Sequence, residues 1–230
     1  MTEDIEIVRH PTARRVKLAF DPASGRIRLT IPKRASATKA LAWAAGHREW
    51  IAAQRANLPQ ARPFAPGAII PVADDRLTIE WREGASRIVR REGDRLLLSG
   101  ASATVARRVE GWLRREALRL LEADTSLYAD RAGVRVARVS IGDPRGRWGS
   151  CTSDGAIRYS WRLLLAPAAV RQATAAHEVA HRIHMNHSPA FHALVEAIYG
   201  EDPTPHRQWL RTNGASLHWY GRSSTGGGGG

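Results

Sequence analysis

The sequence predicts an α+β protein with a mostly β amino-terminal region that contains one helix, followed by a region in which a small antiparallel sheet packs on a helix. Three observations support this class. Residues 5–31 alternate apolar and polar side chains with turn signals between them, which is typical of strands. Residues 102–124 repeat apolar side chains at helical spacing. Residues 177–181 spell H-E-x-x-H inside an alanine-rich segment without glycine or proline, which favours a helix.

The amino-terminal region contains a predicted hairpin and one predicted helix. Apolar residues alternate on both sides of the turn at residues 21–25, so residues 16–31 are expected to pair as two strands. Ser36 is a suitable N-cap for a helix over residues 36–57. Three prolines mark residues 58–67 as a loop. Further strands are predicted at residues 77–81, 87–89 and 96–98.

The carboxyl-terminal region mixes helices and strands. Apolar residues at helical spacing predict a packed helix over residues 102–124, followed by strands at 134–141 and 157–164. The H-E-x-x-H segment is expected to form a helix from Pro167 to Ile183. Two further helices are predicted at residues 189–199 and 205–211. The expected domains are residues 1–100, residues 101–220 and a disordered glycine-rich tail over residues 221–230.

The H-E-x-x-H segment predicts a metal site. On a helix, positions i and i+4 lie on one face, so the imidazoles of His177 and His181 can bind one ion. Glu178 is offset by one position and is therefore expected beside the metal, where a carboxylate can act as a base toward bound water. Two nitrogen ligands with an adjacent carboxylate are typical of a zinc hydrolase, so Zn²⁺ is the expected cofactor.

A catalytic zinc usually has three protein ligands, and four residues after the motif are candidates for the third. His184 lies roughly 10 Å along the helix from His177, which is too far for a straight helix. His187 follows Asn186 in a predicted tight turn and is best placed. Glu196 is a real competitor, and it would lie with His192 on the next helix.

The residues around the motif resemble the YgjP-like metal-dependent hydrolases, bacterial relatives of the WLM and SprT-like zinc metallopeptidases. The resemblance covers roughly residues 5–220 and implies a zincin-like catalytic domain. It also implies that His177, His181 and His187 are metal ligands and that Glu178 is the catalytic base, and the sequence does not depart from the pattern at these positions. The matching segments are residues 147–151, 157–158, 161–163, 165–167, 177–181, 186–189 and 191, with Arg14, Arg15, Lys17, Leu18, Trp50, Ile51, Arg207, Trp209 and Leu210.

Composition limits the class of protein. No run approaches the ~18 apolar residues of a membrane span, and the acidic start lacks an apolar signal core, so no membrane partner and a cytoplasmic location are expected. The single Cys151 cannot form an internal disulfide and is expected to be a small buried residue on a strand. A net charge of +13 is compatible with a nucleotide or nucleic-acid partner. The arginines are nevertheless spread along the chain without a basic run.

The most direct functional hypothesis is a metallopeptidase that cleaves peptide bonds with zinc-bound water and Glu178 as general base. The side chain that stabilises the oxyanion is not identified, and the candidates are Tyr159, Arg162, His206 and Tyr220.

Two alternative functions remain. A metal-dependent nucleotide pyrophosphohydrolase would use nearby arginines against a phosphoanhydride, although three imidazoles favour zinc over the magnesium of most phosphate enzymes. A DNA-associated SprT-like protease would bind DNA through the basic surface. The arginines that the first alternative requires are Arg145, Arg147, Arg158 and Arg162.

Overall fold

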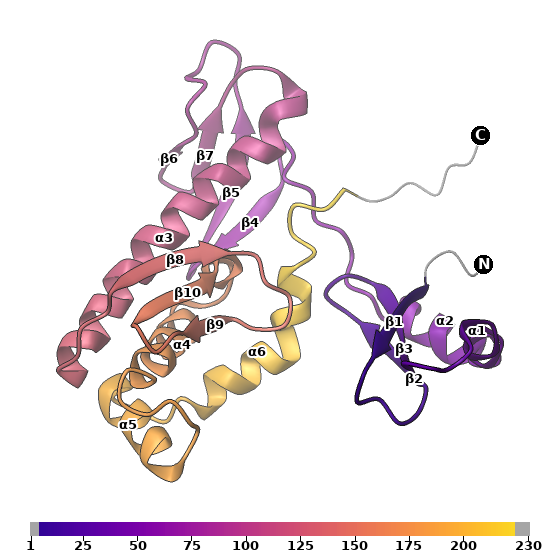
Figure 1. Ribbon diagram of the computed structural model, residues 1–230. Coiled ribbons are helices and arrows are strands. Elements are labelled where there is room, and N and C mark those ends of the chain that lie inside the picture. Colours follow the sequence, from indigo (N-terminus) through magenta and orange to yellow (C-terminus); the bar gives the residue numbers. More distant parts are fainter. Residues whose placement is uncertain (1–4, 224–230) are drawn as a thin grey trace. The chain divides into compact units, whose positions relative to one another are not determined.

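The computed structural model describes residues 5–223, and its contacts divide the chain into two compact units, residues 1–60 and 61–230 (Figure 1). The boundary expected after residue 100 falls inside the second unit, because the strands before it share one hydrophobic core with the helices and strands that follow. Residues 224–230, which include most of the tail predicted to be disordered, lie outside the described residues.

The first unit contains a three-stranded sheet. Strands β2 (Lys17–Asp21) and β3 (Arg26–Pro32) pair antiparallel, so the predicted hairpin is confirmed. The Asp21 carboxylate closes the turn by accepting hydrogen bonds from the two residues that follow Pro22. Strand β1 (Ile5–His10) adds to the other edge of β3 in parallel.

The predicted helix over residues 36–57 is two helices, α1 (Ala37–Ala45) and α2 (Arg48–Ala56). The Ser36 side chain caps α1 as expected. The break lies at Gly46, whose backbone N–H bonds back to the last turn of α1 and which has a low helix propensity. The core of this unit is small and consists of Leu29, Ile31, Ala40 and Ala44.

The second unit begins with a four-stranded sheet in the order β4-β5-β7-β6. Strand β5 (Asp75–Trp81) pairs antiparallel with β4 (Ile69–Val72) and parallel with β7 (Arg95–Leu98). The sequence missed β4, in which Pro71 hides the strand signal and is tolerated because β4 is an edge strand.

The strand predicted at residues 87–89 is wrong, because the edge strand β6 begins later and spans Arg90–Glu92. All three of its residues are charged and exposed, so it carries none of the apolar alternation that predicts a strand. β6 pairs antiparallel with β7.

Helix α3 (Val105–Ala132) runs along the second unit, beside the four-stranded sheet at one end and β8 at the other (Figure 1). It is longer than the predicted helix over residues 102–124 and ends at Gly133, which has a left-handed conformation. Asp124 and Thr125 interrupt the apolar pattern in the sequence. Both are buried and satisfied by tertiary partners, and these partners are not evident from the sequence.

A second three-stranded sheet lies next to the helix that carries most of the H-E-x-x-H motif, α4 (Ala168–Ala180). Strand β10 (Ala156–Ser160) is central, with β8 (Arg138–Gly142) parallel on one side and β9 (Gly149–Cys151) antiparallel on the other. The predicted antiparallel sheet is therefore mixed. The strand predicted at residues 157–164 ends at Ser160, and Trp161–Leu165 form a 3-10 helix in which every residue is buried. An unbroken apolar run does not distinguish these two conformations.

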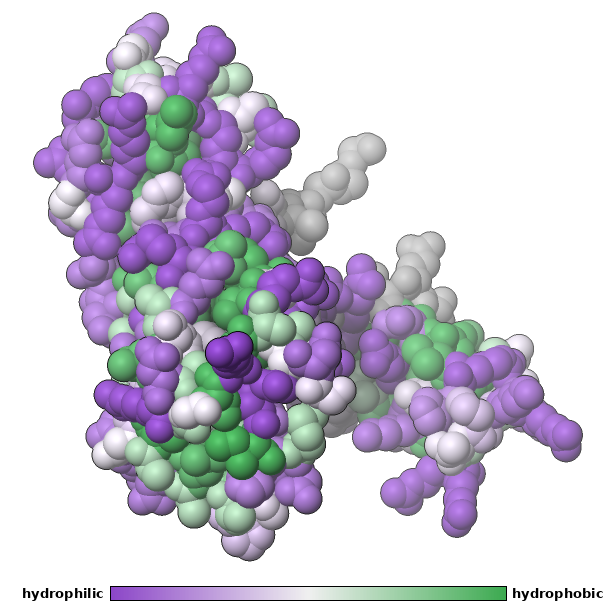
Figure 2. Space-filling view, turned by 60° about the vertical axis from the view of Figure 1, so that its left-hand side comes forward, coloured by the Kyte–Doolittle hydropathy of each residue, from purple (hydrophilic) through white to green (hydrophobic). Residues whose placement is uncertain are grey.

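Three helices complete the unit. Helix α4 (Ala168–Ala180) carries most of the H-E-x-x-H motif and ends before the predicted Ile183. Helix α5 (Pro189–Tyr199) lies where it was predicted, and α6 (Thr204–Leu217) continues well beyond the predicted residues 205–211. Among residues 5–223, no helix is both long enough and apolar enough to cross a membrane. On the face shown in Figure 2, the second unit displays apolar patches separated by hydrophilic side chains.

Candidate metal centre

The end of α4 places two imidazoles one helical turn apart. His177 is half-buried in the last turn, and His181 caps the helix with a right-handed conformation, so the i, i+4 spacing is kept although α4 formally ends at Ala180. Their ring centroids are 5.0 Å apart. Helix α4 is held rigidly in place, because the core of the unit includes its residues Val170, Ala175, Ala176, Val179 and Ala180.

The turn between α4 and α5 places a third imidazole, that of His187, in contact with those of His177 and His181. Ser188 is the N-cap of α5, and its hydroxyl accepts a hydrogen bond from the backbone N–H of Phe191. His187 immediately precedes this cap. Its Nε2 lies 3.1 Å from Nε2 of His177, and one nitrogen from each of the three histidines lies within 4.8 Å of the others.

The donor set fits a zinc ion. Three ligand nitrogens at about 2.0 Å from one zinc lie roughly 3.3 Å apart, which is close to the separation of the His177 and His187 nitrogens. Nδ1 of His181 lies 2.9 Å from the carbonyl oxygen of His184. A carbonyl only accepts, so Nδ1 carries the hydrogen and donates it, and Nε2 of neutral His181 keeps its lone pair for a metal.

The electrostatics of the cluster also favour metal binding. Burial, and to a smaller extent the neighbouring His181 and His187, lower the pKa of His177 to about 3. Burial likewise lowers the pKa of His181. Neutral imidazoles are the form that binds metals, so these two rings hold available lone pairs at neutral pH.

Phe191 forms the floor of the cluster. It is fully buried, and its ring centroid lies 4.9 Å from that of His177, 4.5 Å from that of His181 and 4.8 Å from that of His187. One rigid aromatic side chain therefore restricts the orientation of all three imidazoles. Phe191 lies three residues after the Ser188 cap and is one of the residues that match the family, but neither signal places it against the histidines.

Glu178 lies beside the three imidazoles in a largely buried position, with 5% of its surface exposed. Burial raises the pKa of this carboxyl to about 7, and the positive charge of Arg147 acts in the opposite direction. Gly149 of β9 packs directly against the carboxylate. The pKa of Glu178 is therefore close to neutral pH, so the carboxyl group can both accept and release a proton there.

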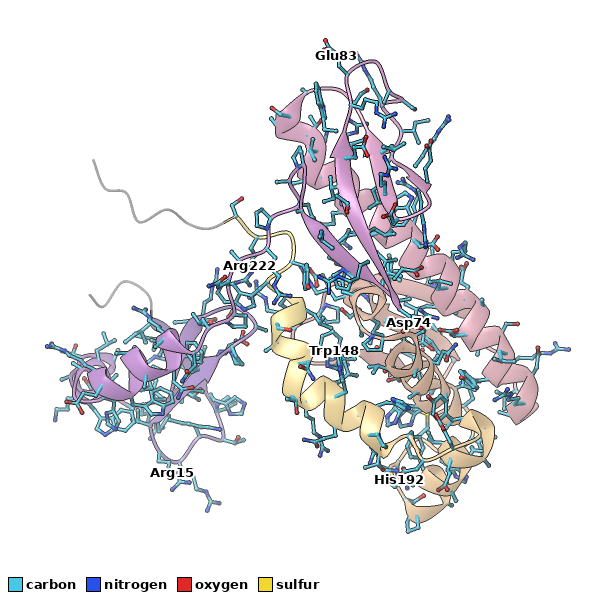
Figure 3. All side chains as sticks on the ribbon, turned by 180° about the vertical axis from the view of Figure 1, so that it is seen from behind. Arg15, Asp74, Glu83, Trp148, His192 and Arg222 are labelled. Carbon is cyan, nitrogen blue, oxygen red and sulfur yellow. The ribbon has the colours of Figure 1, made fainter. Side chains whose placement is uncertain are left out.

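His177, His187 and Glu178 line a cleft of about 570 Å³, and the buried His181 contacts both of these histidine rings. β9 borders it on one side and α6 on another, and Trp148 and His192, which both line it, are labelled in Figure 3. The strand that lines the cleft is the edge strand β9, through Gly149, and not the central strand β10. The lining residues are Trp148, Gly149, Val170, Ala173, Thr174, His177, Glu178, His187, His192, His206, Arg207, Leu210 and Arg211.

The other candidates for a third ligand lie apart from the cluster. His184 contributes its backbone carbonyl to His181, and its ring is not a member of the group. His192 lines the cleft, but it is one turn along α5 and also outside the group. Glu196 is exposed on α5.

Three of the four candidates for stabilising the oxyanion bind other side chains and do not line the cleft. Tyr159 is fully buried and hydrogen-bonds to Thr125, the Arg162 guanidinium pairs with Asp143, and Tyr220 is hydrogen-bonded to Arg62. Only His206 lines the cleft.

The arginines considered for a phosphate substrate also lie outside the cleft lining. Arg145, Arg147 and Arg158 are exposed, and Arg162 donates to Asp143 and to backbone carbonyls. The cations that do line the cleft, Arg207 and Arg211, were not predicted as site residues from the sequence, since only tertiary packing brings α6 to α4.

Two comparisons gave no relatives: neither the curated proteins nor the solved structures contain a match to this chain. A third comparison, with protein families, matches residues 14–213 to the family described as YgjP-like, metallopeptidase domain. The match covers most of the chain, including the three histidines, Glu178 and α6 up to Asn213. The expected resemblance is therefore confirmed: this chain belongs to the YgjP-like family, whose domain is that of a metal-dependent peptidase.

Proposed function

We propose that this protein is a zinc-dependent metallopeptidase in which His177, His181 and His187 hold the metal and Glu178 is the general base. The observation that carries the proposal is the convergence of three imidazoles at a cleft that is also lined by the buried carboxylate of Glu178. Three nitrogen ligands from the protein leave a position open for water, as in other catalytic zinc sites.

The bound zinc supplies Lewis-acid polarisation of the scissile carbonyl and lowers the pKa of water to about 7. The residues of the chain prepare the site for this chemistry. The carbonyl oxygen of His184 fixes the tautomer of His181, and Phe191 restricts the orientation of the three rings. Both contacts reduce the reorganisation needed when the metal binds.

Glu178 moves the protons. Its carboxylate accepts a proton from the attacking water, and the resulting carboxylic acid donates that proton to the leaving amine of the peptide. The pKa of about 7 suits both steps, because neither protonation state is strongly disfavoured near neutral pH. Packing against Gly149 keeps the carboxylate at the wall of the cleft, within reach of the substrate.

The test is a pair of variants, Glu178→Gln and Glu196→Gln. Glu178→Gln should keep the metal content of the wild type and lose about 10²–10⁴-fold in peptide hydrolysis, because the amide cannot accept the proton. Glu196→Gln should keep both metal and activity, since Glu196 is exposed on α5. Full activity of Glu178→Gln, or loss of metal from Glu196→Gln, would contradict the proposal.

The same assay separates the other two activities considered for this site. Nucleoside triphosphates offered in place of peptide test phosphoanhydride hydrolysis, and DNA added to the peptide assay tests stimulation by nucleic acid. The peptidase proposal predicts that only the peptide is cleaved and that DNA does not change its rate.

A further inference from the structure

Helix α6 forms a cationic wall of the cleft. His206, Arg207, Leu210 and Arg211 line it, and positions 207 and 211 are one turn apart on the same side of the helix. Among the described lining residues, Glu178 is the only acid, and its carboxylate is assigned to proton transfer. The cleft therefore carries two permanent positive charges with no balancing carboxylate.

Neither arginine is used structurally. Within the described part of the chain, no carboxylate lies within salt-bridge distance of Arg207 or Arg211. The side chain of Arg211 also makes no hydrogen bond to the described residues. The two acids just before α6, Glu201 and Asp202, contact other residues of this segment. Glu201 lies 3.5 Å from Nε2 of His206, and Asp202 accepts the backbone N–H of Thr204.

The half-buried Arg207 differs in this respect from the buried Arg162 and Arg171. Its Nε is buried without a hydrogen-bond partner, and its one contact is from Nη1 to Nδ1 of His192 at 3.5 Å. Nη1 of Arg171 is also buried without a partner, but the Arg171 guanidinium pairs with Asp124 at 2.6 Å, and that of Arg162 pairs with Asp143 at 2.7 Å. Buried donors in folded proteins nearly always have a partner, so a guanidinium that lines a cleft with an unpartnered Nε and no carboxylate partner points to an anionic group that binds there.

We propose that Arg207 and Arg211 form a subsite that binds a carboxylate of the peptide substrate next to the three imidazoles. The inference rests on the proposed peptidase function and adds a substrate class to it. A guanidinium presents paired N–H donors that match the two oxygens of a carboxylate, which a single ammonium does not.

The apolar part of the same cleft fits the rest of the ligand. Val170, Ala173 and Leu210 line the same cleft and can contact the methylene groups of an acidic side chain or the last side chain of a peptide. The carboxylate has two possible sources, a Glu or Asp side chain of the substrate or its carboxyl terminus. Both present the same chemistry to Arg207 and Arg211.

Two peptide pairs distinguish these sources. In the first pair, a fluorescently labelled peptide with blocked ends contains either Glu or Gln at one position, scanned along its length. In the second pair, a peptide without acidic side chains has either a free or an amidated carboxyl terminus. Binding is measured by fluorescence anisotropy on full-length, zinc-loaded Glu178→Gln protein, so that turnover does not consume the probe.

The carboxylate member of at least one pair should bind about tenfold more tightly than its amide. Arg207→Gln and Arg211→Gln should each remove most of that preference, and Arg211→Glu should favour a Lys-containing peptide. Arg138→Gln is the matched control, because Arg138 is exposed on β8 and the substitution removes the same charge away from the cleft. Its carboxylate preference should equal that of the parent protein.

The result also separates the subsite from the peptidase proposal. A carboxylate preference that depends on Arg207 and Arg211 supports the subsite even if the wild-type enzyme cleaves none of these peptides. Peptide cleavage without any carboxylate preference, or a preference unchanged in both arginine variants, would overturn it. Stronger competition by a nucleoside triphosphate than by either carboxylate peptide would also overturn the assignment to a peptide.

Discussion

The backbone of Gly149 lies so close to the carboxylate of Glu178 that no side chain fits between them. A Cβ atom on Gly149 would lie 2.5 Å from Oε1 of Glu178 and 2.6 Å from its Cγ. The backbone of Gly149 is not left-handed, so glycine is required here for space and not for conformation. This contact sets where the proposed base lies relative to the cleft.

Gly149→Ala should therefore displace Glu178 and reduce peptide turnover by at least about tenfold, because a shift of the order of 1 Å in a catalytic group is enough for such a loss. Zinc content should stay at the wild-type level, since the three imidazoles come from the end of α4 and the turn before α5 and not from β9. Gly146→Ala is the control, because Gly146 lies in the loop just before β9 with an ordinary backbone conformation, and a Cβ atom added there would meet nothing within 4 Å. Equal activity of the two variants would show that the contact does not position Glu178.

The raised pKa of Glu178 predicts a dependence of stability on pH in the metal-free protein. A carboxyl whose pKa rises from 4.5 to about 7 on folding stabilises the fold below pH 4.5 and loses that contribution as the pH rises through about 7. The full difference corresponds to about 3 kcal/mol. Glu178→Gln has no such group, so its Tm relative to the wild type should rise between pH 4.5 and pH 8. A Tm difference that is constant over this range would contradict the raised pKa.

The contact of Phe191 with all three histidines predicts its effect on metal affinity. Phe191→Leu should weaken zinc binding by about 10–100-fold, as expected when the groups that orient metal ligands are changed. Competition with a chromogenic chelator measures the affinity. Phe64→Leu changes an equally buried phenylalanine that makes no contact with the histidines, so it should lower the Tm and leave zinc affinity unchanged.

The buried ion pair between Arg171 of α4 and Asp124 of α3 predicts a large loss of stability when only one partner is removed. Arg171→Met should lower the free energy of unfolding by about 3–5 kcal/mol, because it leaves a buried carboxylate without its partner. The double variant Arg171→Met with Asp124→Leu should recover much of this loss. Urea unfolding of the single and double variants measures both, and additive effects of Arg171→Met and Asp124→Leu would contradict the pairing.

The convergence of the three histidines could be predicted from the sequence because it depends on local geometry. The i, i+4 spacing fixes His177 and His181, and the Asn186 and Ser188 signals place His187 in the turn that follows. Their role as metal ligands, and that of Glu178 as base, stays a prediction. The long apolar stripe of α3 was found for the same reason, since helical periodicity is a property of neighbouring residues.

The features that the sequence missed depend on contacts between distant segments. In the sequence, the polar Asp124 indicates the end of a helix. In the structure it is buried inside α3, because it pairs with Arg171, 47 residues later. The run at residues 161–165 is entirely buried, so it lost the alternation that distinguishes a strand from other conformations. Likewise, nothing near Arg207 in the sequence indicates the cleft, because α6 meets α4 only in the folded unit.

The three imidazoles differ in their access to solvent: His187 is exposed, His177 is half-buried and His181 is buried. A hydrated cation arriving from solution would therefore meet the ring of His187 first and could shed its waters stepwise as the inner rings replace them. Loading and exchange would then need no more than a local movement of the short turn before α5. The helices and sheets of the second unit would remain folded throughout.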